Sequence, residues 1–168
     1  MKNLCIFGML LMLSMSIFSC GGNNAEKAAS DSIYKALHTP EAIKARAQEI
    51  FENHKDVPAV LTEKFAKIYK EADSLNNIYI DKKGQAACLD YDLLNGSDGD
   101  TVHAGKVDII SNKDNEVVVN VHMKESDNSK FKYTLVYERD NWYLDDVDGQ
   151  HQYLAGAINA MRQKLGIK

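Results

Sequence analysis

Apolar residues recur at helical spacing in the first part of the chain and at alternate positions in the second. Thr39-Pro40-Glu41 has the composition of a helix start, with an N-cap residue, a proline and an acid in order. The apolar stripe that follows predicts a helix over about 40–54. Asp56-Val57-Pro58 opens a second stripe, which predicts a helix to about residue 74. Because the link is short, we expect these two helices to be antiparallel neighbours.

After Asn77 the apolar period changes from helical to alternating. Residues 89–94 have the pattern of a short strand or turn, and the glycines of 95–100 indicate a loop. Consecutive strands joined by polar turns then predict an antiparallel meander, and a last helix is expected up to Leu165. The predicted strands are 103–110, 116–123, 130–138 and 142–147.

This order of elements predicts the fold class. Helices separated from a run of antiparallel strands are typical of an α+β domain, with the N-terminal helices packed on the sheet and a C-terminal helix after it. The chain has 168 residues and 45% hydrophobic residues, which is enough for one domain with its own core. We expect this single domain to cover residues 39–168.

The first residues have the pattern of a targeting segment. Lys2 precedes an apolar run over 4–18 that is too short to span a bilayer comfortably. The run ends in Ser19-Cys20, which resembles the lipobox of bacterial lipoproteins. That resemblance implies a signal peptide over 1–19, lipid on the Cys20 thiol and an acylated new amine. The alternative is an ordinary secretory signal with a chance cysteine.

The polar segment 20–38 is expected to be a tether, with a helical turn at 33–37 that packs on the domain. Residues 21–24 contain neither the acids of export tags on surface lipoproteins nor the aspartate that retains other lipoproteins at the inner membrane. We therefore expect a lipid-anchored protein of the outer membrane that faces the periplasm.

The charge pattern excludes several classes of protein. The formal net charge is -4, from 20 basic and 24 acidic residues, and the lysines are scattered along the chain. Nucleic-acid binding is therefore not expected, because phosphate backbones require clustered cations. The chain has no nucleophile elbow, phosphate-binding glycine loop or paired zinc-ligand motif. Neither a cofactor nor a metal is expected on this basis.

Two stretches carry a family resemblance. LDYDLLNGSDGD (89–100) resembles a motif of an uncharacterised domain family found in bacterial lipoproteins, and NWYLDDV (141–147) resembles the closing strand of that family. The family has the cone-shaped, cystatin-like α+β fold of the nuclear transport factor two superfamily. The resemblance implies helices packed on a curved antiparallel sheet that encloses a pocket. The superfamily contains isomerases, dehydratases, transport factors and binding domains, so the fold does not supply a function.

Acidic residues provide the first candidate chemistry. Asp90 and Asp92 share a face if their segment is extended, and Asp146 lies on the inward side of an unbroken last strand. If these strand ends meet, their carboxylates could hold Ca²⁺ or Mg²⁺, or one could act as a general base, as the superfamily resemblance allows. The plainer interpretation is that these acids cap turns and bind backbone amides.

Histidines and aromatic residues provide the second candidate chemistry. His122 could form a dyad with Asp90 or Asp92, although an ordinary hydrogen-bonded histidine explains it as well. Trp142 and Tyr91 would line either the core or a ligand pocket. The candidate ligand-binding residues are thus Asp90, Asp92, Asp146, Trp142, Tyr91 and His122.

Two functions from different classes follow. The preferred one is a non-enzymatic module that contacts another envelope protein or a small ligand through the concave sheet or an exposed sheet face. The alternative is a small-molecule isomerase or dehydratase with Asp90 or Asp92 as general base. A Ca²⁺-stabilised domain is a third hypothesis.

Overall fold

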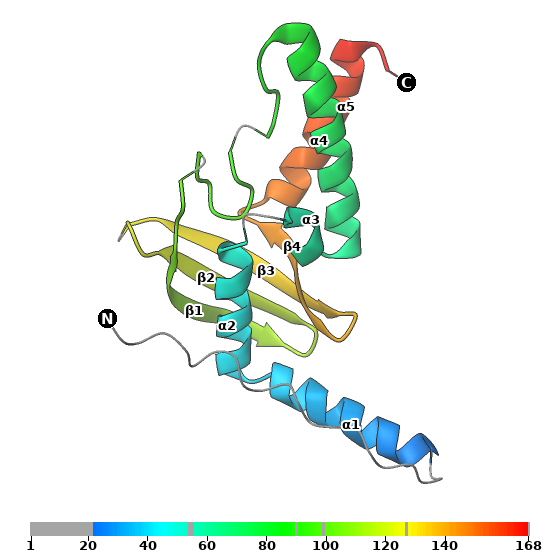
Figure 1. Ribbon diagram of the computed structural model, residues 1–168, viewed down its shortest axis with the longest axis vertical. Helices are drawn as coiled ribbons and strands as arrows, with labels where there is room; N and C mark the ends of the chain where they lie inside the picture. Colours follow the sequence, from blue (N-terminus) through cyan, green and yellow to red (C-terminus); the bar gives the residue numbers. More distant parts are fainter. Residues whose placement is uncertain (1–21, 54–55, 90, 99, 127, 168) are drawn as a thin grey trace, which may run out of the picture.

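The computed structural model describes residues 22–53, 56–89, 91–98, 100–126 and 128–167. Helices are followed by a four-stranded antiparallel sheet and a C-terminal helix, which confirms the predicted α+β class (Figure 1). In chain order the elements are α1 (Gly22–Leu37), α2 (Pro40–Phe51), α3 (Val57–Val60), α4 (Glu63–Lys83), β1 (Ala104–Lys113), β2 (Glu116–Met123), β3 (Lys130–Glu138), β4 (Asn141–Val147) and α5 (Gln150–Leu165).

The sheet is the meander that the alternating pattern predicts, with strand order β1-β2-β3-β4. Side chains alternate between its two faces, so one face is apolar and enters the core. This inner face is covered by α2, which lies across it (Figure 1). Its buried residues include Val117, Val119, Val121, Tyr133, Leu135, Trp142 and Leu144.

Helix α2 begins where the sequence predicts. The Thr39 side chain accepts a hydrogen bond from the Ala42 amide at 3.3 Å, and Pro40 occupies the first turn. This cap satisfies an amide that has no partner within the helix. The apolar stripe of α2 is fully buried against the sheet, and it consists of Ile43, Ala47, Ile50 and Phe51.

The second predicted helix is wrong in two respects. It is divided into α3 and α4 by Leu61, which pairs with Leu144 at the edge of the sheet, and the Thr62 amide donates to the Leu144 carbonyl at 2.9 Å. Thr62 then caps α4 through a hydrogen bond from the Phe65 amide at 3.2 Å. The helix also continues beyond residue 74 to Lys83 and ends at Gly84, whose φ of 73° is left-handed.

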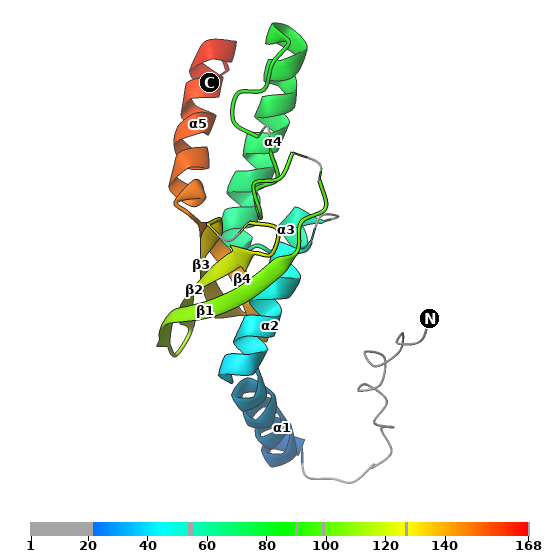
Figure 2. The same ribbon diagram turned by 90° about the vertical axis from the view of Figure 1, so that its left-hand side faces the viewer.

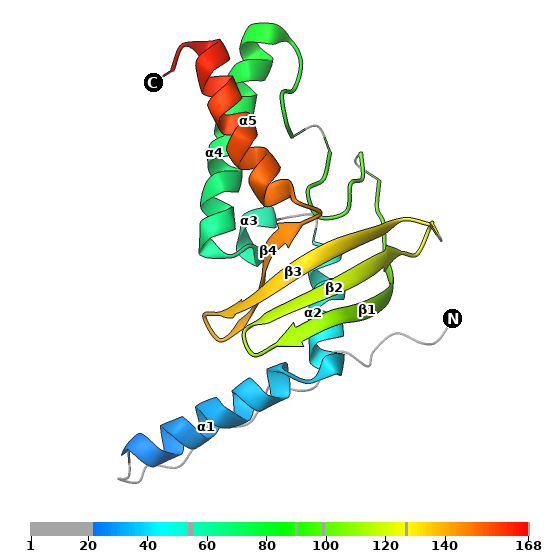
Figure 3. The same cartoon turned by 180° about the vertical axis from the view of Figure 1, so that it is seen from behind.

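The expected antiparallel pairing of the first two helices is also wrong. Helix α4 packs against α5 instead, and α2 packs on the sheet (Figures 1 and 3). An ion pair of 2.7 Å joins Arg162 of α5 to Glu71 of α4, and the Phe65 ring stacks on His151. The extended residue Leu61 explains the difference, because it redirects the chain along β4 before α4 begins.

Residues 22–37 form a continuous helix, where the sequence indicates a polar tether with one helical turn. Residues 28–36 of α1 are exposed, and the helix contacts the rest of the chain near its C-terminal end. Helix α1 lies at one end of the long axis and the α4–α5 pair lies at the other (Figure 1). The segment is therefore a projecting helix, and its role as the link to a membrane stays a prediction.

Candidate functional site

The second face of the sheet carries the candidate residue His122. It carries the alternate residues of each strand, among them Val118, Asn120 and Thr134 of the two central strands, and none of these three is buried. Within the described part of the chain no helix crosses this face (Figures 2 and 3). We call it the open face. Its central residues combine aliphatic and hydrogen-bonding side chains, a composition suited to contact with another molecule.

His122 lies on the open face and forms a different pair from the predicted one. Its Nε2 is 3.1 Å from Oδ2 of Asp108 on the neighbouring strand. Nζ of Lys106 is 2.7 Å from the other carboxylate oxygen of Asp108. His122 is thus a hydrogen-bonded histidine, the alternative that the sequence left open beside a dyad with Asp90 or Asp92, because β2 pairs with β1 and brings Asp108 to it. The hydrogen bond from Lys106 lowers the pKa of Asp108 below its ordinary value of 3.8.

Two further lysines lie beside this group. The β2–β3 register places Lys130 opposite His122 and Lys132 opposite Asn120. Both lysines are exposed. Residues directly opposite one another on neighbouring strands lie about 5 Å apart at Cβ, so these side chains share one end of the open face.

The acids at the end of β4 do not form a site. A bulge in the β3–β4 pairing places Leu144 opposite Leu135 but Asp146 opposite Thr134, so Asp145 is the extra residue. Val147 then points into the core with 1% exposure, and Asp146 turns to the other side. The predicted inward position of Asp146 is therefore wrong, because the alternation of faces is interrupted one residue before it.

Asp145 and Asp146 both accept hydrogen bonds. The Asp146 carboxylate accepts from the amides of Gly149 and His151, both at 2.9 Å. Oδ1 of Asp145 accepts from the Thr62 hydroxyl at 2.8 Å. Asp146 thereby caps the start of α5, where unpaired amides and the helix dipole favour a carboxylate. This is the structural role that the plainer sequence interpretation gives to such acids.

The loop before β1 holds two more predicted residues. Oδ1 of Asp92 accepts from the Leu94 amide at 2.7 Å, which makes a local turn and not a strand. Tyr91 is 41% exposed, and its hydroxyl accepts from the Gln150 side chain at 3.1 Å. Asp90 lies outside the described residues, as does the lipid-attachment candidate Cys20.

Buried polar groups hold this loop in place, and sequence reasoning missed them. Asn76 is 2% exposed within α4, and its Oδ1 accepts from the amides of Ala87 and Cys88 at 2.7 and 3.2 Å. Asn95 is fully buried and donates to the Phe51 carbonyl. The Tyr133 hydroxyl donates to the Leu94 carbonyl, and burial raises the pKa of this phenol well above its ordinary value. The sequence contains a signal for Asn76, because an asparagine at an apolar position of a helix requires a hydrogen-bond partner.

Trp142, a candidate ligand-binding residue, lies in the hydrophobic core. It is fully buried, and its Nε1 donates to the Leu37 carbonyl at the end of α1 at 2.8 Å. The His38 ring lies 3.7 Å from Tyr34, 4.6 Å from Tyr137 and 4.7 Å from Trp142, measured between ring centroids. We call these four residues the aromatic clasp. His38 also lies 3.0 Å from the Asp114 carbonyl through Nε2, so the clasp joins α1 to the β1–β2 turn.

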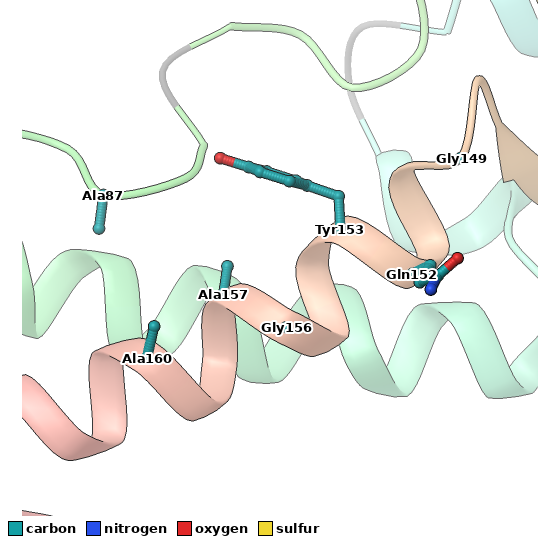
Figure 4. A pocket seen from close by; sticks show the side chains of 7 residues that line it. All are labelled: Ala87, Gly149, Gln152, Tyr153, Gly156, Ala157 and Ala160. Atoms are coloured by element: carbon teal, nitrogen blue, oxygen red, sulfur yellow. The ribbon is translucent and has the colours of Figure 1, made fainter.

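Two open hollows are lined by residues that the structure describes. One, of about 560 Å³, lies between α5 and the segment that follows α4 (Figure 4). Its lining is Ala87, Gly149, Gln152, Tyr153, Gly156, Ala157 and Ala160. The other, of about 480 Å³, is lined by Pro58, Glu63, Ala66, Lys67, Lys70 and Arg139. Of the predicted candidates, neither hollow contains any among its lining residues.

Within the part of the chain that the structure describes, the acids suggested as a cation site do not form a cluster. In the described ranges no three side chains of histidine, cysteine, aspartate or glutamate are close enough to hold a metal ion. Nor is any described helix both long and apolar enough to cross a bilayer. No family model, curated protein or solved structure matches this chain.

Proposed function

We propose that the protein is a lipid-anchored lipoprotein of the outer membrane, facing the periplasm, and that it binds a partner without catalysing a reaction. The anchor rests on the apolar run 4–18 and on Ser19-Cys20. Two or more acyl chains would hold the protein stably on a membrane, whereas one would not. Helix α1 begins two residues after Cys20 and would connect the lipid to the domain.

The proposed binding function rests on the open face of the sheet. A central strand of a two-layer α+β domain is ordinarily covered on one face and exposed to solvent on the other. The side chains on the solvent-exposed face are then mostly polar. Here the central outer positions include Val118 and Val136 beside Asn120 and Thr134. This mixture of aliphatic and hydrogen-bonding groups resembles a protein–protein interface more than a purely solvated surface.

The chemistry of the acids also favours binding over catalysis. An isomerase or dehydratase needs a carboxylate in an apolar cavity, facing its substrate. Asp92, Asp145 and Asp146 instead accept hydrogen bonds from backbone amides or from a hydroxyl. Their carboxylate oxygens accept the hydrogen bonds of turns and of a helix start. These three acids therefore give no support to the enzymatic alternative.

We also propose that the domain is related to the cone-shaped nuclear transport factor two-like fold. The order of helices, antiparallel meander and C-terminal helix supports this relationship. The motif resemblances at 89–100 and 141–147 support it as well. Fold relationship alone would not assign an activity.

The anchor is tested by a Cys20→Ala variant of the full chain. We expect the unmodified chain to incorporate a labelled fatty acid and to remain in membranes after an alkaline wash. The variant should lose the label and leave the membrane fraction. Retention of the variant in washed membranes would refute the lipid anchor.

The open face is tested by photocrosslinking in intact cells, with p-benzoylphenylalanine in place of Asn120. We expect a discrete covalent adduct with another envelope component. The matched control carries the same group in place of Lys70, which is exposed on α4. Absence of adducts at position 120, or the same adducts from both positions, would contradict binding through the open face.

A further inference from the structure

His38 directly follows the last residue of α1, and both nitrogens of its ring face backbone carbonyl oxygens. Nδ1 lies 2.7 Å from the carbonyl oxygen of Tyr34, and Nε2 lies 3.0 Å from that of Asp114 in the β1–β2 turn. A carbonyl oxygen only accepts hydrogen bonds, whereas a neutral imidazole donates from one nitrogen alone. Both contacts are therefore hydrogen bonds only when the ring carries two protons. A neutral ring would turn a lone pair toward one of the two oxygens.

The rest of the aromatic clasp also suits a charged His38. The Tyr34 ring stacks on it with 25° between the two planes, and the rings of Tyr137 and Trp142 pack on it at 58° and 53°. Aromatic rings at such distances attract a cation. His38 moreover stands at the C-terminal end of a 16-residue helix, where the partial negative charge of the unpaired carbonyls favours a cation.

The other titratable groups at the clasp do not replace His38 as the group that changes charge near neutral pH. The Tyr34 hydroxyl donates to the same Asp114 carbonyl at 3.3 Å. Desolvation raises the pKa of the Tyr137 phenol, and the charge of Asp140 acts in the same direction, so this phenol stays neutral. The charged residues on the surrounding elements are Lys35 of α1, Arg46 of α2, Asp114 of the β1–β2 turn and Asp140 of the β3–β4 turn.

Helix α1 is held on the domain by a small number of groups. Residues 28–36 are exposed, and besides the His38 contacts the helix is joined to the sheet by the hydrogen bond from Trp142 Nε1 to the Leu37 carbonyl. The charge of one ring can therefore change the fraction of molecules in which this helix is docked.

We propose that His38 is a pH-sensitive latch: its doubly protonated ring holds α1 on the sheet, and loss of one proton releases the helix. Histidine changes its charge between about pH 5 and 8. Because the docked arrangement uses the second proton, docking is favoured at the acid end of this range and weakens as the pH rises. The inference is independent of the proposed binding function. If Cys20 carries lipid, the latch would decide whether the domain is held rigidly or loosely at the membrane.

The test measures the distance between two spin labels on the detergent-purified full chain, at Ser30→Cys on α1 and Lys44→Cys on α2. Both positions are exposed, and α2 is fixed on the sheet. We expect one narrow distance distribution at about pH 5.5 and a several-fold larger share of long or scattered distances at about pH 8. Nuclear magnetic resonance of the histidine ring nitrogens, on the chain without labels, follows the charge of His38. Its midpoint should coincide with that of the distance change.

His38→Phe keeps an aromatic ring in the clasp but has no nitrogen to donate, so the labelled variant should lose the pH response. The matched control is His103→Phe, which makes the same substitution at a histidine whose side chain is 56% exposed. This control should keep the response.

Three results would overturn the proposal. The distance distribution could be the same at both pH values, the two histidine variants could lose the response equally, or the His38 ring could titrate with a midpoint separate from that of the distance change. The ring measurement needs no substitution at position 38, so it decides the matter even if His38→Phe does not fold.

Discussion

Asp146 lies at the junction of β4 and α5, where its carboxylate binds two backbone amides. Replacing such a cap with alanine leaves both donors without their partner. We predict that Asp146→Ala lowers the free energy of unfolding by roughly 1–2 kcal/mol. Urea denaturation measures this change. Asp98→Ala, at an exposed loop position, is the control and should change stability by less than about 0.5 kcal/mol. Equal effects of the two substitutions would contradict the capping role.

Asn76 has a comparable role at a buried position. Its side chain receives the amides of Ala87 and Cys88 and donates to the Leu89 carbonyl. We predict that Asn76→Ala destabilises the fold by roughly 2–4 kcal/mol, since two amides would lose their acceptor in the interior. Asn77→Ala is the matched control, because Asn77 is the next residue of α4 and is exposed. A thermal or urea transition that moves equally for both variants would argue against this account of Asn76.

Asp108 gives a prediction about pH. Because the hydrogen bond from Lys106 holds its pKa below the ordinary value, its carboxylate stabilises the fold above about pH 4, and this contribution is lost as the pH falls through the lowered value. We expect an NMR titration of the Asp108 carboxyl carbon to have its midpoint below 3.8. Lys106→Met should raise the midpoint. An unchanged midpoint in this variant would show that Lys106 is not the cause.

Helix α1 depends on the aromatic clasp for its position on the domain. Residues 28–36 are exposed, so the helix gains little from burial along most of that length and is held near its end. We predict that His38→Ala accelerates hydrogen exchange of the α1 amides several-fold and leaves α2 unchanged, because the ring contacts and the link to the Asp114 carbonyl are lost. Mass spectrometry of deuterated peptides measures this. Ile33→Ala, at a 54% exposed position of α1, should have no such effect, and equal acceleration in both variants would contradict the clasp.

The periodicity of apolar residues predicts most of the helices and strands that such a pattern can reveal. The strands 116–123 and 130–138 agree with β2 and β3, and the Thr39 cap is present. Alternation within a strand and a stripe on a helix are local patterns, so one sequence reveals them.

Features that depend on tertiary contacts could not be predicted from the sequence pattern. The break at Leu61 arises because that residue joins the edge of the sheet, and the bulge at Asp145 arises from the pairing of β3 with β4. Neither partner is visible from local sequence. The candidate site failed for the same reason, since Asp146 was placed by an alternation that the bulge interrupts, and His122 was given a partner before the strand register was known.

In the whole molecule the sheet lies between α1 and the α4–α5 pair (Figure 1). Helix α1 has 16 residues and is therefore roughly 24 Å long. If the lipid is attached at Cys20, this helix sets the distance between the membrane and the domain, and the clasp sets the angle. The open face would then be held away from the bilayer surface and be available to a partner in the periplasm.

Binding through the open face predicts that this face is covered by a partner in the envelope. The measurement is the rate at which a water-soluble maleimide labels an Asn120→Cys variant in envelopes and in purified protein. Cys88 is buried, and Cys20 would carry the lipid, so the introduced thiol dominates the signal. If a partner covers the open face, labelling should be several-fold slower in envelopes than in purified protein, with no such difference for Lys70→Cys on α4. Equal rates at position 120 in both preparations would contradict binding through the open face.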